Sequence, residues 1–150
     1  MKRKSLLICL LAMCCTLFSF FATACTKTKE GPAMESIVAS VEFTDENTVA
    51  IRVSDVYDNT FLLTVMQTLQ MHEKLTFTKD STNMVTGING KQNPADWSAC
   101  WMLYTSDTDF ASEQFGSCIY DGVEYDSAIF GAAQMPVVNG GLYIWKYTSF

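Results

Sequence analysis

Three dipeptides of Asn or Asp followed by Gly divide the second half of this 150-residue chain. They are Asn89-Gly90, Asp121-Gly122 and Asn139-Gly140, and each stands beside apolar segments. Because Gly accepts the positive φ that the tightest β-turns require, such dipeptides are typical of antiparallel hairpins. We therefore expect a tight turn at each position, with strands next to it.

The first of these turns lies in the most distinctive stretch of the sequence. Residues 84–88 are expected to form a short strand, and residues 100–104 an aromatic strand that follows a polar loop. We expect these two strands to form a hairpin. In the second strand Trp101 and Leu103 share one face, Met102 and Tyr104 share the other, and neither face is polar. Such a strand lies either wholly in a core or half in a core and half in a binding surface.

The N-terminal segment, residues 1–24, has the features of an export signal. A basic start at residues 2–4 precedes an apolar run, and small residues at 22–24 precede Cys25. This arrangement resembles a bacterial lipobox, which implies that Cys25 carries a lipid and holds the chain on the outer face of the cytoplasmic membrane. An ordinary signal peptide and an uncleaved anchor are the alternatives. Residues 25–36 are polar, contain Gly31-Pro32 and are expected to form a flexible tether.

The remaining chain is acidic. Removal of the three basic residues at 2–4 leaves 7 Lys and Arg against 16 Asp and Glu, a formal charge of −9. Nucleic acid is not expected as a partner, because its phosphates need basic side chains to displace their counterions. An enzyme is not expected either, since His72 is the single histidine and no nucleophile, phosphate-loop or metalloprotease motif is present.

Two cysteines, Cys100 and Cys118, remain in the expected domain. In an exported chain they either form one disulfide or stay as two buried thiols, and the sequence leaves both alternatives open. No metal site is expected, because two thiolates without a nearby histidine cannot complete four-coordinate zinc.

Periodicity places the other elements. Residues 37–43 and 49–53 alternate as a hairpin does, and residues 142–147 form a closing strand with one aromatic face. Between the first hairpin and the closing strand, one run of apolar residues follows helical spacing. It predicts one helix that packs on a sheet, with its N-cap within residues 58–60. The helical stripe consists of Leu62, Val65, Met66 and Leu69.

This order of elements resembles the transcobalamin-like C-terminal domain, which occurs in the cobalamin carriers transcobalamin and intrinsic factor and in bacterial surface lipoproteins. The resemblance implies an α+β, β-grasp-like domain over residues 37–150, with a mixed or antiparallel sheet of short strands packed on one helix. Residues 105–125 depart from the family, because they are longer than its usual turn. The motifs that carry the resemblance are Ile88-Asn89-Gly90, Trp101-Met102-Leu103-Tyr104, Gly131 and Asn139-Gly140.

The resemblance also implies a binding function rather than a catalytic one. The first hypothesis is capture of a flat, largely apolar small molecule such as cobalamin or another corrinoid, which needs aromatic and aliphatic side chains around it. The alternative is a cell-surface protein-interaction or scaffold module without a small-molecule ligand. The aromatic residues available for the ligand are Trp97, Trp101, Tyr104, Tyr125 and Phe130.

Overall fold

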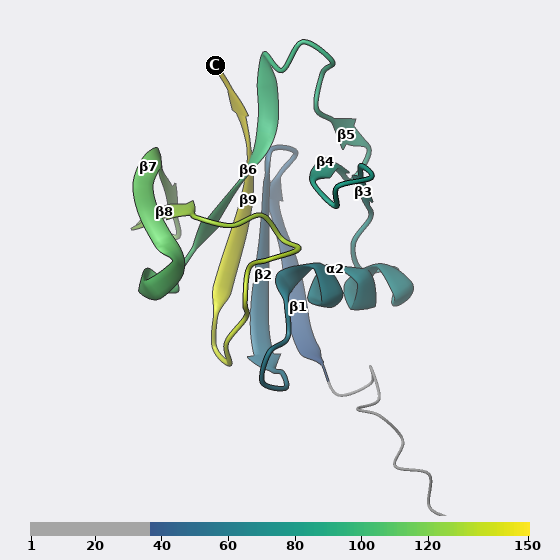
Figure 1. The fold of residues 1–150 in the computed structure, drawn as a ribbon, viewed down its shortest axis with the longest axis vertical. Helices are drawn as coiled ribbons and strands as arrows, with labels where there is room; N and C mark the ends of the chain where they lie inside the picture. The colour runs from purple at the N-terminus through teal and green to yellow at the C-terminus, as the bar shows by residue number, and fades with distance from the viewer. Residues whose placement is uncertain (1–36) are drawn as a thin grey trace, which may run out of the picture. The chain divides into compact units, whose positions relative to one another are not determined.

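The computed structural model describes residues 37–150, which belong to one compact unit, Ala33–Phe150 (Figure 1). Strands hold 51% of the described residues and helices 11%. None of the helices described there is long and apolar enough to cross a membrane. The elements are β1 (Val38–Asp45), β2 (Thr48–Asp55), α2 (Leu62–Met71), β3 (Phe77–Lys79), β4 (Val85–Ile88), β5 (Lys91–Gln92), β6 (Ala99–Thr105), the 3-10 turn η2 (Thr108–Phe110), β7 (Ala111–Tyr120), β8 (Val123–Ala128) and β9 (Leu142–Ser149).

The main sheet has six antiparallel strands in the order β1-β2-β9-β6-β8-β7. Its first hairpin, β1–β2, confirms the prediction for residues 37–53. The closing strand β9 lies between β2 and β6, so that Ile144 stands opposite Ala50 on one side and Tyr104 on the other. In Figure 1 the yellow β9 runs beside β6 and β2 accordingly. Strands distant in sequence therefore meet at β9.

The hydrophobic core lies on one face of this sheet. Helix α2, the small sheet β3-β4-β5 and the segment after β8 all contribute buried side chains to it. The predicted helical stripe is confirmed, because all four of its residues are at most 3% exposed. From β9 the core receives Tyr143 and Trp145, as expected for the aromatic face of the closing strand.

The start of α2 differs from the prediction. Its N-cap is Phe61, which provides no side-chain hydrogen bond, and the expected cap within residues 58–60 is wrong. The carbonyl groups of Met135 and Ala132 instead accept hydrogen bonds from the backbone N–H groups of Leu62 and Leu63, each at 2.9 Å. A distant loop thus satisfies donors that a polar cap residue would otherwise take.

The hairpin expected between residues 84–88 and 100–104 is also wrong. At Asn89 and Gly90 the backbone adopts φ values of 48° and 83°, and this tight turn leads directly into β5. Strand β4 therefore pairs with β3 and β5 in the small sheet, whereas β6 belongs to the main sheet. The predicted turn at Asn89-Gly90 is confirmed. The strand that follows it in the pairing is β5, immediately after the turn, rather than residues 100–104 beyond the polar loop.

The expected fold class, an α+β β-grasp-like sheet packed on one helix, is contradicted by these strand pairings. The structure is mostly β, with a six-stranded and a three-stranded sheet and one α-helix among the described residues. The ten-residue helix shares the first face of the main sheet with other segments. Residues 105–125, which depart from the family resemblance by their length, contribute β7 and the start of β8, and these two strands form one edge of the main sheet.

The helix offers a matched pair of substitutions that measures its packing. Met66 is fully buried and Met71 is 67% exposed. We expect Met66→Ala to lower the free energy of unfolding by about 2–5 kcal/mol, because it leaves a cavity in the core. The control Met71→Ala should change it by about 0.5 kcal/mol or less. Urea denaturation of both variants measures this difference, and equal effects would contradict the observed orientation of α2.

Candidate functional site

The β7–β8 hairpin is the part of the domain with the most exposed apolar surface on a strand pair. It turns at Asp121 and Gly122, whose φ values of 51° and 77° are those of a tight hairpin turn, so that Tyr120 stands opposite Val123. This confirms the predicted hairpin. The pairing of β8 with β6 is confined to Tyr104 and Ser127, beyond which the two strands diverge.

Beyond its single paired position with β6, the hairpin lies over the second face of the main sheet, which is the face opposite α2. Cys118 and Tyr120 of β7 are buried there in a cluster with Ala50, Tyr104 and Ile144. These last three residues belong to β2, β6 and β9, and their side chains point away from the first core. The main sheet is therefore apolar on both faces, and the hairpin covers the face that the helix leaves open.

Polar contacts fix the tip of the hairpin on the first two strands. The Tyr120 hydroxyl donates a hydrogen bond of 2.9 Å to the Glu42 carboxylate on β1. Arg52 of β2 forms an ion pair of 3.2 Å with Asp121 and lies 5.8 Å from the centre of the Tyr120 ring. Burial, together with Glu42, raises the pKa of Tyr120, so its hydroxyl is protonated at neutral pH. The hairpin thus reaches from β6 across to β1.

The opposite side of the hairpin is open to solvent. Ile119 is 71% exposed and Phe115 is 58% exposed. A hollow of about 470 Å³ beside them is lined mostly by acidic and small side chains. We call this region the exposed hairpin surface, defined by Glu113, Phe115, Ser117, Ile119, Glu124 and Asp126.

Two further properties distinguish this surface. Residues 102–145 contain six Asp or Glu and no Lys or Arg, so the chain that builds it is purely acidic. In addition, β7 is an edge strand, since β8 is its one partner among the described strands. A bulge before Ser117, with Gly116 at a φ of 84°, interrupts β7, and regular strand geometry continues over residues 117–120. This last segment carries an unpaired edge.

The five aromatic residues expected to bind a ligand do not form one site. Trp101 is buried in the first core, whereas Tyr104 is buried on the second face with Tyr125 packed against its cluster. Trp97 lies in the loop before β6 and is 51% exposed, and the ring of Phe130 lies 6.0 Å from that of Phe110. The structure therefore brings together Tyr104 and Tyr125 alone.

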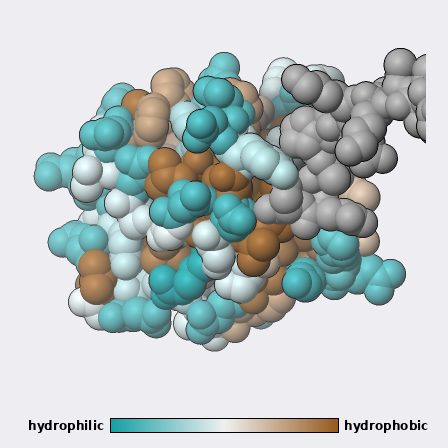
Figure 2. All heavy atoms as spheres, turned by 90° about the horizontal axis from the view of Figure 1, so that it is seen from below, coloured by the Kyte–Doolittle hydropathy of each residue, from teal (hydrophilic) through white to brown (hydrophobic). Residues whose placement is uncertain are grey.

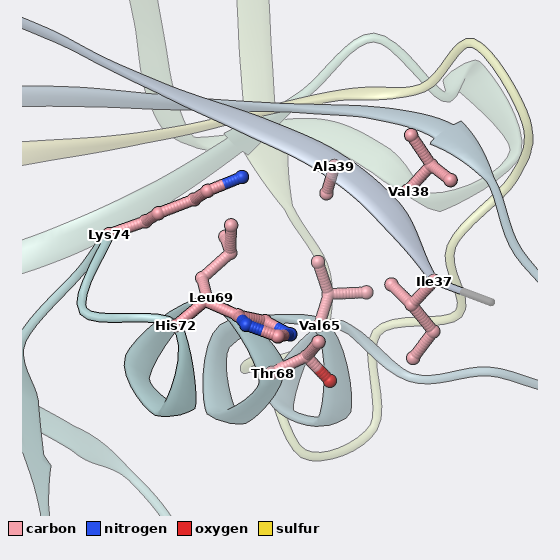
Figure 3. Close-up of a pocket in the computed structure, with 8 residues that line it drawn as sticks. All are labelled: Ile37, Val38, Ala39, Val65, Thr68, Leu69, His72 and Lys74. Atoms are coloured by element: carbon pink, nitrogen blue, oxygen red, sulfur yellow. The ribbon is translucent and has the colours of Figure 1, made fainter. Parts of the chain in front are cut away.

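One pocket of the described domain is lined by none of those aromatic residues. It is a groove of about 190 Å³ between β1 and α2, in which Val65 and Leu69 point from the helix toward Ala39 (Figure 3). Typical small-molecule sites have volumes of about 300–1,000 Å³. The groove is therefore too small for a macrocycle such as a corrin.

Hydrophobic side chains are also exposed at the start of β1 and between β2 and α2. Val38, Tyr57 and Phe61, at the start of β1 and after β2, are 52%, 48% and 42% exposed. Seen from below, hydrophobic residues gather in the middle of the face and hydrophilic residues surround them (Figure 2). Strand β1 is also an edge strand of the main sheet, but Lys74 lies beside its start, so this region lacks the uniform acidic charge of the exposed hairpin surface.

Of the two alternatives left open for the cysteines, the structure has the free thiols. Cys118 is 4% exposed, and Cys100 is partly buried. Burial raises the pKa of both thiols, that of Cys118 to about 11, although the nearby charge of Lys146 opposes the shift there. Both cysteines therefore carry protons at neutral pH.

Comparisons with protein families, curated proteins and solved structures gave no match to this chain. The likeness to the transcobalamin-like domain, and the corrinoid ligand that it implies, stay predictions. The signal at residues 1–24, the lipid on Cys25 and the tether at residues 25–36 lie outside the described residues.

The raised pKa of Cys118 is testable by alkylation. In a Cys100→Ser form of Ala33–Phe150, Cys118 is the one cysteine. Because the thiolate is the reactive form, its labelling rate with iodoacetamide should keep rising by about tenfold per pH unit up to pH 10. In urea the same thiol should show an ordinary profile, which levels off above about pH 8.5. A folded-state rate that levels off there as well would contradict the burial of Cys118.

Proposed function

We propose that residues 37–150 form a protein-binding module on the outer face of the cytoplasmic membrane, and that the exposed hairpin surface binds an extended, basic segment of a partner protein. This is the interaction-module hypothesis of the sequence analysis. The observation that carries it is an edge strand, β7, that exposes Phe115 and Ile119 on a chain segment, residues 102–145, with six acidic and no basic side chains.

An unpaired edge strand offers main-chain donors and acceptors to an added strand. Proteins usually protect such edges with charges, bulges or covering segments, because an apolar edge recruits other chains. Here the bulge at Gly116 leaves residues 117–120 available, and Ile119 in that segment is the most exposed large hydrophobic residue of the hairpin. In this mode of recognition the backbone supplies affinity and the side chains supply specificity.

Charge indicates the chemistry of the partner. Glu113, Glu124 and Asp126 surround the hollow beside the edge, and residues 102–145 contribute no basic side chain that would neutralise them. Lys or Arg residues at alternate positions of an added strand would lie on the same face as Ile119, so that their apolar stems would cover Ile119 and their charged ends would meet these carboxylates. Complementary charge of this kind raises the association rate and suppresses wrong partners.

The hairpin is also held in place before a partner arrives. Tyr120 and Asp121 bind Glu42 and Arg52 of the first two strands, and the inner side of the hairpin is buried. A surface fixed in this way loses little conformational entropy on binding. The corrinoid hypothesis has no comparable support, since the five aromatic residues expected for it do not share a cavity.

A photo-cross-linking residue placed at position 119 tests the surface directly. We expect Ile119→benzoylphenylalanine to yield one discrete cross-linked product in the host cells. The matched control is the same substitution at Met71, which is similarly exposed but lies on α2. Identical products at both positions, or none at position 119, would contradict the proposal.

Charge reversal then tests the chemistry of the partner. In the position-119 background, Glu124→Lys with Asp126→Lys should reduce the yield of that product by at least about tenfold, since both carboxylates face the proposed basic segment. Glu73→Lys, in an exposed residue after α2, is the control and should leave the yield unchanged. An unchanged yield in the double variant would exclude a basic partner segment.

A further inference from the structure

The groove between β1 and α2 has a size that suits one apolar side chain. Val65 and Leu69 of the helix and Ala39 of the strand form its apolar lining (Figure 3). Its volume of about 190 Å³ is slightly larger than that of an apolar cavity of about 150 Å³ that binds benzene. A side chain of the size of leucine or phenylalanine therefore fits the groove.

The polar groups available in this groove are basic. His72 and Lys74, which follow α2, line it, and both are exposed. The Lys74 side chain extends toward Ala39 of β1 (Figure 3). Thr68 also lines the groove, but its hydroxyl already donates a hydrogen bond of 3.0 Å to the Thr64 carbonyl. A ligand with an apolar group and a negative charge would match this arrangement.

Positive charge is scarce in the domain, which makes its position informative. Residues 37–150 contain five Lys or Arg against fourteen Asp or Glu. Arg52 and Lys91 form ion pairs with carboxylates, whereas Lys74 forms none with another described residue. Glu73, its neighbour in sequence, does not line the groove. An anion in the groove would therefore meet a cation that no described carboxylate already neutralises.

The end of α2 does not cancel this attraction. The C-terminal end of a helix carries partial negative charge on its free carbonyl groups, which opposes an anion. Here the Thr68 carbonyl accepts a hydrogen bond of 3.1 Å from the His72 N–H, and the Leu69 carbonyl accepts one of 2.9 Å from the Lys74 N–H. Because these carbonyl groups are satisfied, the two basic side chains dominate the charge at this end of the groove.

The groove also lies beside a free strand edge. Strand β1 is the first strand in the order of the main sheet, and β2 is its one partner among the described strands. The pairing is regular from Ala39 to Phe43, so alternate residues of this stretch direct their N–H and C=O groups away from β2. Since β2 occupies the other side of β1, the groove opens along this edge. An extended chain can pair with the edge and place one side chain in the groove.

We propose that this groove binds the C-terminal residue of a partner polypeptide. The apolar side chain of that residue occupies the groove, its carboxylate binds Lys74 and His72, and the preceding residues pair with the free edge of β1. Hydrogen bonds between charged groups of this kind are about twice as strong as neutral ones. This site does not depend on the exposed hairpin surface, because β1 and β7 are opposite edges of the main sheet.

Methyl NMR of Ala33–Phe150, labelled with carbon-13 at Val and Leu, tests the site with a defined probe. The probe is the peptide acetyl-Ser-Thr-Ser-Leu with a free carboxylate. We expect saturable shifts of the Val65 and Leu69 methyl signals, with the signals of Val123 on the hairpin unchanged. The same peptide with a C-terminal amide should bind at least about tenfold more weakly, since a charged hydrogen-bond acceptor is lost. Isocaproate, which has the leucine side chain and a carboxylate but no peptide backbone, should also bind at least about tenfold more weakly.

A lysine substitution tests the partner of the carboxylate. Lys74→Gln should weaken binding of the free-carboxylate peptide by at least about tenfold and leave the affinity for the amide peptide unchanged. The matched control is Lys79→Gln, in an exposed lysine that does not line the groove, and it should change neither affinity. The proposal is wrong if the probe gives no saturable shift at millimolar concentration, if the amide binds as tightly as the free acid, or if isocaproate binds as tightly as the peptide.

Discussion

The central position of β9 is the constraint on which the other parts of this structure depend. This strand joins the first hairpin to β6, and side chains on both of its faces are buried: Tyr143 and Trp145 on one, Leu142 and Ile144 on the other. A strand that is apolar on both sides requires a cover on each. The helix, the small sheet and the segment after β8 cover the first face, and the β7–β8 hairpin covers the second. The hairpin is therefore part of the core as well as the proposed binding surface.

Local features of the fold could be predicted from the sequence, and long-range pairings could not. The turns at Asn89-Gly90 and Asp121-Gly122 and the apolar stripe of α2 depend on neighbouring residues, so periodicity and turn chemistry identify them. The partners of β4 are local, but β5 has only two residues, which is too short to show a strand pattern. The partners of β6 and β9 lie tens of positions away in the sequence. The predicted N-cap of α2 is wrong because the groups that accept hydrogen bonds from its first N–H groups lie in the distant loop near Met135.

The family resemblance led to the wrong fold class because its motifs are mostly turn and strand signals, which many antiparallel proteins share. It also caused residues 105–125 to be interpreted as an added segment. Within them, buried Cys118 and Tyr120 alternate with exposed Ser117 and Ile119, which is the pattern of a strand with one covered and one open side. That alternation, together with the lack of basic residues from position 102 to 145, is the sequence pattern that could have predicted the candidate site.

The placement of β9 also affects how the molecule acquires its structure. Among the described strands the central one, β9, comes last in sequence, and it pairs with β2, nearly one hundred residues earlier. Until β9 is present, β2 and β6 have no common neighbour, and neither face of the main sheet can close. Folding dominated by such distant contacts is slow, since loop-closure entropy is lost before the contacts form. The growing chain thus stays open until residues 142–149 are available, and cooperative closure of both layers follows their pairing.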